Sequence, residues 1–131
     1  MIVIDASVLA NVVGDDGPDG RRARRELRAA GDLAAPDLVD VETVAVLRKR
    51  WLAGSISEGR FAAAVRDLED IDVDRYPVLR FMRRAWELCA NVTPYDATYV
   101  ALAETLNCEL WTADQRLAKA SGPACSIRVL N

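Results

Sequence analysis

Short apolar runs alternate along the chain with longer segments in which apolar residues recur every three or four positions. Apolar runs of this kind are typical of strands buried in a parallel sheet, and the longer segments are typical of amphipathic helices. We predict strands at residues 1–5, 33–36, 72–76, 108–113 and 125–131, and helices at 6–13, 18–31, 36–54, 55–71, 77–90, 93–107 and 114–121. This order predicts the α/β class, with a mainly parallel central sheet.

The chain has the size of one domain, and we expect residues 1–131 to form a single unit. The clearest break, GDDGPDG at 14–20, is too short to separate two domains. No apolar run approaches the roughly 20 residues that span a bilayer. The N-terminus lacks a basic segment, and Asp5 interrupts its apolar run. We therefore expect a cytoplasmic protein without a membrane span or secretory signal.

The chain contains no histidine, which excludes Ser-His-Asp and Cys-His triads and histidine-bound zinc. Cys89, Cys108 and Cys125 form no C-x-x-C pair, so we expect buried free thiols. The net charge of −3 argues weakly against a nucleic-acid partner. Arginines cluster, however, at 21–28, 48–50 and 83–84. They either surround an acidic cleft and hold a polyanion, or they form solvated helix faces.

Two aspartates stand where a predicted strand gives way to a helix, namely Asp5 and Asp114. Aspartate is a favoured N-cap, so capping alone explains either of them. Asp96 follows Thr93 and Pro94 in the spacing of a capping box. The same geometry keeps a carboxylate ionised and oriented at the positive end of a helix, as a metal ligand requires.

Glu42 lies inside the predicted helix 36–54, beyond the reach of capping. Its neighbours one turn away are all apolar: Leu38, Val39, Ala45 and Val46. This face of the helix is expected to point into the protein, where an unpaired carboxylate would cost several kcal/mol. Glu42 therefore either forms a buried salt bridge with an arginine or reaches a polar cleft.

The four acids suggest more together than singly. Two like charges about 4 Å apart repel by roughly 4 kcal/mol at an effective dielectric of 20, so a cluster requires a compensating cation. Oxygen ligands without histidine or thiolate favour Mg²⁺ or Mn²⁺, which serve phosphoryl transfer by making hydroxide from water. Ser7 and Thr112 are placed to hydrogen-bond a carboxylate or a metal-bound water, and as ordinary capping hydroxyls they are equally explained.

Three stretches resemble the PIN-domain ribonucleases, most closely the VapC-type toxins of bacterial toxin–antitoxin pairs. MIVIDASVLA resembles the opening strand of the family, DVETVAVLRKRWLAGSIS its glutamate helix, and TPYDATYVALAETLNCELWTADQRLA its most specific segment. The resemblance places the four catalytic and metal-binding acids at Asp5, Glu42, Asp96 and Asp114, with Thr112 in a T-x-D motif. Gln115 and Arg116 stand where some members carry a further acid.

The resemblance implies a three-layer α/β/α fold and an endoribonuclease toxin that uses Mg²⁺ or Mn²⁺. It also implies a homodimer that acts on RNA and is neutralised by a cognate antitoxin. The alternative is a non-catalytic acidic α/β module, PIN-like or receiver-like, that acts through a protein partner. A receiver-like module would need paired acids after the first strand and a lysine at a late strand end. Asp15 and Asp16 are instead in a predicted loop and Lys119 in a predicted helix.

Overall fold

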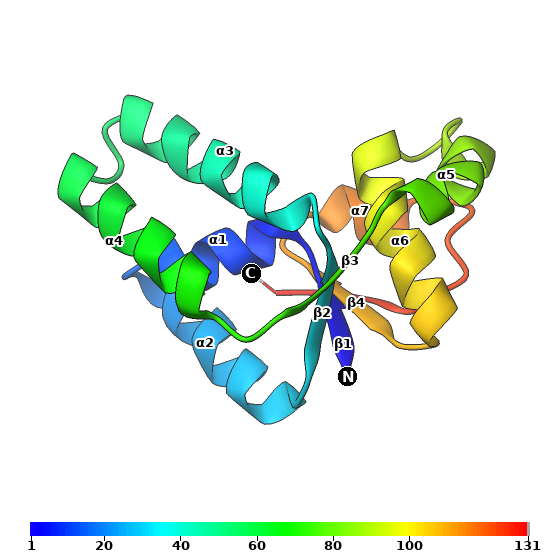
Figure 1. Ribbon diagram of the computed structural model, residues 1–131, viewed down its shortest axis with the longest axis horizontal. Coiled ribbons are helices and arrows are strands. Elements are labelled where there is room, and N and C mark those ends of the chain that lie inside the picture. Colours follow the sequence, from blue (N-terminus) through cyan, green and yellow to red (C-terminus); the bar gives the residue numbers. More distant parts are fainter. Residues whose placement is uncertain (131) are drawn as a thin grey trace.

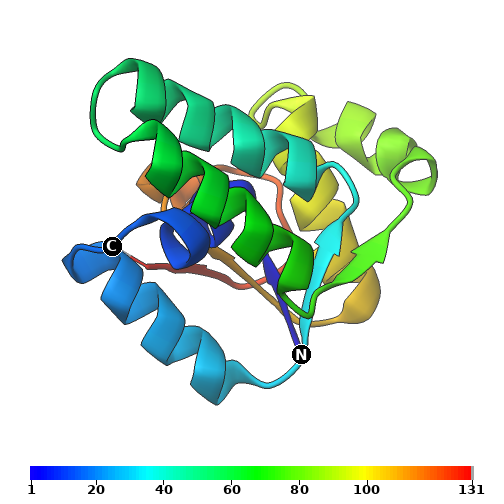
Figure 2. The ribbon, with the colours of Figure 1, turned by 60° about the vertical axis from the view of Figure 1, so that its left-hand side comes forward.

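The computed structural model describes residues 1–130, and its centre is a five-stranded sheet (Figures 1 and 2). The strands are β1 (Ile2–Ile4), β2 (Leu33–Pro36), β3 (Asp74–Tyr76), β4 (Glu109–Thr112) and β5 (Ile127–Val129). Their order is β3-β2-β1-β4-β5, and every neighbouring pair is parallel. The predicted α/β class with a parallel sheet is confirmed. Asn131, the last residue of the predicted final strand, lies outside the described residues.

Helices cover both faces of the sheet. The helices on one side are α1 (Ala6–Gly14), α2 (Pro18–Ala30), α3 (Val39–Leu52) and α4 (Glu58–Asp70). The other side carries the 3₁₀ turn η1 (Leu79–Phe81), α5 (Met82–Leu88) and α6 (Pro94–Leu106), and α7 (Gln115–Lys119) joins β4 to β5. The chain moves from β1 to β3 and then returns to β4 and β5, and right-handed connections in opposite directions place their helices on opposite faces. The expected three layers follow (Figure 2).

The helix predicted at 36–54 begins later than expected. Pro36 is still part of β2 and is paired with Tyr76 of β3, and the backbone N–H of Asp37 donates to the Tyr76 carbonyl at 2.9 Å. α3 therefore starts at Val39. This corrects the expectation for Glu42, which lies in the first turn of α3 and not in the interior of a longer helix.

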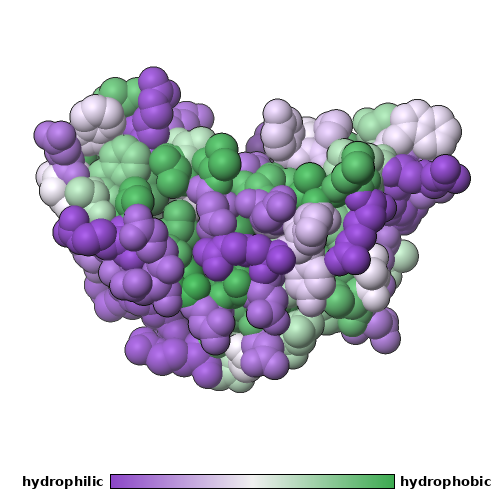
Figure 3. Space-filling model, viewed as in Figure 1, coloured by the Kyte–Doolittle hydropathy of each residue, from purple (hydrophilic) through white to green (hydrophobic). Residues whose placement is uncertain are grey.

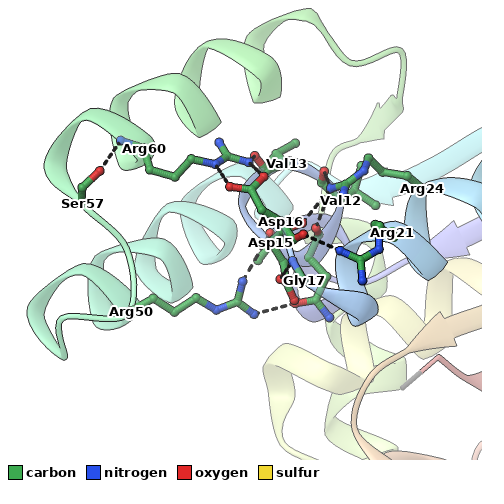
Figure 4. A network of polar contacts seen from close by, with 12 residues as sticks. Val12, Val13, Asp15, Asp16, Gly17, Arg21, Arg24, Arg50, Ser57 and Arg60 are labelled. Atoms are coloured by element: carbon green, nitrogen blue, oxygen red, sulfur yellow. Dashed lines mark hydrogen bonds and ion pairs between the residues drawn. The ribbon is translucent and has the colours of Figure 1, made fainter.

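The turn between α1 and α2 is held by arginines from three helices (Figure 4). Arg24 donates to the carbonyls of Val12 and Asp15 at 2.9 and 2.8 Å. Arg60 of α4 donates to both carboxylate oxygens of Asp16, at 2.9 and 3.1 Å. The carbonyl groups at the end of α1 thus find partners in side chains instead of water. The break predicted at 14–20 is shorter in the structure, because Gly14 ends α1 and Pro18 already starts α2.

The burial of the cysteines differs from the expectation. All three thiols are free, as expected, but Cys89 is exposed and the other two are half-buried, so the prediction of buried thiols is wrong. Cys89 directly follows the short helix α5, which packs only one side against α6. Among the described residues, no helix combines the length and apolar character needed to cross a membrane.

Candidate active site

The predicted acids lie on elements that come together where the sheet changes direction. From β1 the chain moves to β2 on one side, whereas β4 lies on the other side of β1. Open parallel sheets bind ligands at the carboxyl ends of the strands beside such a reversal. Asp5 directly follows β1, and Asp114 follows β4 after one residue. α6 packs along β1, β2 and β4 and leads back to the start of β4, so its first residues lie at the same edge.

Asp5 is fixed by three hydrogen bonds at the start of α1. The Ser7 hydroxyl and the Val8 backbone N–H donate to Oδ1 at 2.5 and 3.1 Å, and the Thr112 hydroxyl donates to Oδ2. The side chain is only 6% exposed, and burial raises its pKa while these hydrogen bonds lower it. Asp5 is therefore both an N-cap and a buried carboxylate, so the two interpretations drawn from the sequence are compatible.

The same hydroxyls join the ends of β1 and β4. The Ser7 hydroxyl accepts from the backbone N–H of Ala113 at 2.9 Å, and the Thr112 hydroxyl accepts from that of Asp114 at 3.0 Å. Each hydroxyl thus accepts a hydrogen bond from the β4–α7 loop and donates one to Asp5. Both predicted supporting groups touch the predicted acid, and they hold its carboxylate in one direction.

Glu42 occupies the edge of the buried stripe of α3. The stripe is formed by Val39, Thr43 and Leu47, whereas Ala45 is exposed. The expectation that the face of Glu42 is wholly buried is therefore wrong. Its Oε1 accepts a hydrogen bond from the hydroxyl of Tyr99 at 2.8 Å. Burial raises the pKa of Glu42, the hydrogen bond from the neutral Tyr99 acts to lower it, and the charges of Asp96 and Asp5 add to the rise. Of the two alternatives, the polar cleft is favoured over the arginine salt bridge.

Asp96 lies in the first turn of α6, whose N-cap is Thr93. The backbone N–H of Asp96 donates to the Thr93 hydroxyl at 3.2 Å, as the capping box predicts. Burial and the charge of Asp114 raise the pKa of Asp96, against smaller opposing effects from Thr93 and Arg116. The carboxylate is thus held at a helix N-terminus but is destabilised by a neighbouring acid.

Asp114 is the most solvated of the four acids and caps α7. Its Oδ1 accepts from the backbone N–H of Arg116 at 2.8 Å and lies 3.4 Å from the guanidinium of the same residue. Burial acts to raise the pKa of Asp114, but the hydrogen bonds and charge of Arg116 outweigh it, so the pKa lies below its ordinary value. Arg116 is 92% exposed, which leaves this ion pair weak.

The effects of the four carboxylates on one another's pKa show which of them are neighbours. Asp5, Glu42 and Asp96 lie within reach of one another's charge, and Asp96 also senses Asp114. Within residues 1–130, no group of three or more acidic or cysteine side chains lies close enough together to hold a metal ion. The donors are nevertheless all carboxylate oxygens from four helix starts, and three of them have raised pKa values. A divalent cation of the Mg²⁺ type fits this donor set and would relieve the repulsion.

A small hollow lies between α6 and α7 beside two of the acids. It has a volume of about 230 Å³, and its lining includes Thr93, Asp96, Asp114 and Arg116. The space-filling view shows an indentation along the upper edge of the molecule, between the lobe of α3 and α4 and the lobe of α5 (Figure 3). Both partners of the Asp96–Asp114 pair therefore face a solvent-filled space that can admit a ligand.

Many arginines of the predicted clusters have structural partners. Arg50 donates to the side chain of Asn11 at 2.7 Å, and Arg84 donates to Glu104 at 2.8 Å. Arg75, outside the clusters, likewise donates two hydrogen bonds to Asp40 in the first turn of α3. Clustering along the sequence therefore did not predict which arginines face the acids. Arg116, outside those clusters, is the cation beside Asp114.

Tyr99 is the site residue that sequence reasoning missed. It is 1% exposed, bonds Glu42, and has a raised pKa caused first by burial and then by Glu42, Asp5 and Asp96. The available signal was its position three residues after Asp96, on the same face of α6. A tyrosine in an apolar helix is usually a core residue, and only the contact between α6 and α3 shows its polar role.

The comparisons with known proteins agree on one family. A family model described as "PIN domain" matches residues 2–123. "Ribonuclease VapC9" of Mycobacterium tuberculosis is 40% identical over 130 residues, covering 99% of this chain and 98% of the relative. "Ribonuclease VapC1" of the same species is 37% identical, covering 98% and 96%.

The solved structures show the same fold at low sequence identity. Mycobacterium tuberculosis VapC20, described as a sarcin–ricin loop cleaving toxin, superposes with a TM-score of 0.70 at 20% identity, covering 91% of this chain and 94% of that one. VapBC2 from Rickettsia felis, bound to a DNA fragment from the promoter, gives a TM-score of 0.68 at 12% identity over the full length of both chains.

Proposed function

The chain belongs to the PIN-domain family and to its VapC-type branch, and from this we propose that it is a divalent-metal-dependent endoribonuclease toxin. Asp5, Glu42, Asp96 and Asp114 are the proposed catalytic and metal-binding residues, with Mg²⁺ or Mn²⁺ as the cofactor. The observation that carries the proposal is that burial raises the pKa of three of these carboxylates, and a neighbouring acid raises the pKa of each further, without a strong cationic partner.

The residues of the chain have distinct parts in this proposal. Asp5 is held in one orientation by hydrogen bonds from Ser7 and Thr112. Asp96 and Asp114 lie at helix N-termini, where the dipole favours the ionised form that a metal ligand needs. A bound divalent ion would supply the polarisation of water and phosphate that the chain, lacking histidine, has no side chain to provide.

The proposal extends to the partners of the protein. The relatives are named as ribonucleases, and several similar structures are toxin–antitoxin complexes, which supports an RNA substrate and a neutralising antitoxin. We also propose that the chain is a single domain, forms a homodimer and acts in the cytoplasm. Val41, Leu79 and Trp86 are each more than 70% exposed, and covering such side chains favours association. Sedimentation equilibrium of the purified chain tests this part, and a monomer at all concentrations contradicts it.

RNA cleavage is the direct test of the nuclease proposal. We expect wild-type protein to cleave RNA with Mg²⁺ and to lose cleavage with EDTA. Asp96→Asn should be at least 100-fold slower, because removal of one ligand charge weakens both metal binding and its orientation. Glu69→Gln is the matched control, since this exposed acid on α4 lies outside the cluster and should cleave like wild type. Equal cleavage by all three proteins would contradict the proposal.

The non-catalytic alternative gains no support from the placement of its required groups. Asp15 and Asp16 bind the α1–α2 turn and Arg60 instead of lying beside Asp5 at the sheet edge. Lys119 ends the short helix α7. The arrangement of a receiver-like module is therefore not present in the structure.

A further inference from the structure

Tyr99 is buried between the two helix layers and contacts Glu42. Its hydroxyl donates to Oε1 of Glu42 across 57 residues of sequence, and the side chain is 1% exposed. It lies three residues after Asp96 on α6, while Glu42 is in the first turn of α3. The hydrogen bond therefore connects a carboxylate on one side of the sheet to the helix that covers the other side.

Glu42 is otherwise the least constrained of the acids. Asp5 accepts three hydrogen bonds, and Asp96 and Asp114 are each tied to a helix start. Glutamate has one more rotatable bond than aspartate, and the carboxylate of Glu42 does not cap the first turn of α3, in which the residue lies. Tyr99 bonds only Oε1, so Oε2 is not used by this hydrogen bond. The bond nevertheless restricts the direction in which Oε2 can point.

We propose that Tyr99 is a positioning residue for Glu42, which holds one carboxylate oxygen so that the other faces the divalent cation. This inference rests on the proposed function and adds a residue to it. The phenol suits the task because it donates one hydrogen bond and carries no charge. A lysine or arginine at the same place would neutralise Glu42 and compete with the metal. The rigid ring is buried in the hydrophobic core, so the hydroxyl keeps its place when no cation is bound.

The test compares Tyr99→Phe with wild type and with Tyr95→Phe. Phenylalanine keeps the ring and removes only the hydroxyl. Tyr95 is on the same helix but 65% exposed, which makes Tyr95→Phe a matched control. Titration calorimetry of the RNA-free full-length chain with Mg²⁺ or Mn²⁺ measures the metal affinity. We expect a 10- to 100-fold weaker affinity in Tyr99→Phe, about the effect of removing a group that orients a ligand, and no change in Tyr95→Phe.

A double variant separates positioning from a general structural effect. If Tyr99 acts through Glu42, Tyr99→Phe added to Glu42→Ala should leave the residual metal affinity as it is in Glu42→Ala alone. In RNA cleavage, kcat of Tyr99→Phe should fall while the KM for RNA stays within about two-fold of wild type.

Each outcome decides the inference. Equal metal affinity of wild type and Tyr99→Phe overturns it while leaving the nuclease proposal intact. An additive loss in the double variant, or loss of cooperative unfolding in Tyr99→Phe, makes Tyr99 a structural residue and also overturns it. Failure of the wild-type chain to bind either metal overturns the proposed function and this inference together.

Discussion

At the residue scale, the central feature is that the surroundings shift the pKa values of the site carboxylates and of a structural carboxylate in opposite directions. Burial and neighbouring acids raise the pKa of Asp5, Glu42 and Asp96. Glu104, by contrast, has a lowered pKa because Arg84 donates to both of its oxygens. Acids used for stability are thus paired with arginine, and the proposed metal ligands are left to repel one another.

This contrast predicts opposite effects of two Glu→Gln changes in EDTA at neutral pH. Glu42→Gln should leave the free energy of unfolding equal to or above that of wild type, because the amide oxygen still accepts from Tyr99 and the repulsion disappears. Glu104→Gln should lower it by about 1–2 kcal/mol through loss of the charged partner of Arg84. Urea denaturation measures both, and a larger loss in Glu42→Gln would indicate a buried salt bridge.

The raised pKa values also predict how stability depends on pH in metal-free protein. A carboxyl group whose pKa is higher in the folded than in the unfolded chain stabilises the fold when protonated, and this contribution is lost as pH rises through the folded pKa. Asp5, Glu42 and Asp96 are of this kind. Asp114, Asp16 and Glu104 have lowered pKa values and lose their contribution only below the ordinary carboxyl range. The free energy of unfolding should therefore increase as the pH falls from 7 toward the ordinary carboxyl range.

The chain has no histidine, so no imidazole titrates in this interval. Asp96→Asn is the control variant and should flatten the profile between pH 7 and the ordinary carboxyl range, because it removes one carboxyl group with a raised pKa and the charge that acts on the other two. A steady fall in wild-type stability over this interval would contradict the assignment.

At the element scale, the close approach of α2 to the α1–α2 turn depends on one glycine. A Cβ atom on Gly20 would lie 1.9 Å from the carbonyl oxygen of Asp15, whereas one on Gly59 of α4 meets nothing closer than 4.0 Å. Gly20→Ala should therefore destabilise the protein by about 1–3 kcal/mol. Gly59→Ala should stabilise it by up to about 1 kcal/mol through helix propensity. Chemical denaturation of the pair tests this, and equal effects would show that the turn can move.

The elements themselves could largely be predicted from the sequence, since short apolar runs and amphipathic segments are local patterns. The start of α3 could not, because Pro36 pairs with Tyr76 of β3, a contact between strands distant in sequence. Capping patterns placed Asp96 and Asp114 correctly at helix starts. The link from Tyr99 to Glu42 was invisible, because a tyrosine among apolar residues looks the same whether its hydroxyl meets water or an acid.

At the scale of the whole molecule, the proposed site joins the two helix layers. Asp5 and Glu42 come from α1 and α3 on one side of the sheet, and Asp96 comes from α6 on the other. An ion bound by all three would connect these layers and act on the stability of the complete fold. The repulsion that destabilises the empty protein is then the source of its affinity for a cation.

Metal binding should therefore raise the stability of the whole chain. At a Mg²⁺ concentration 100 times its dissociation constant, the free energy of unfolding should increase by about 2.7 kcal/mol. Because the ligands must be deprotonated, this increase should shrink as the pH is lowered, opposite to the trend in EDTA. Asp5→Asn should lose most of it, and Glu69→Gln should keep it. If Mg²⁺ stabilises Asp5→Asn as much as wild type, the ion binds elsewhere and the acids at the sheet edge are not its ligands.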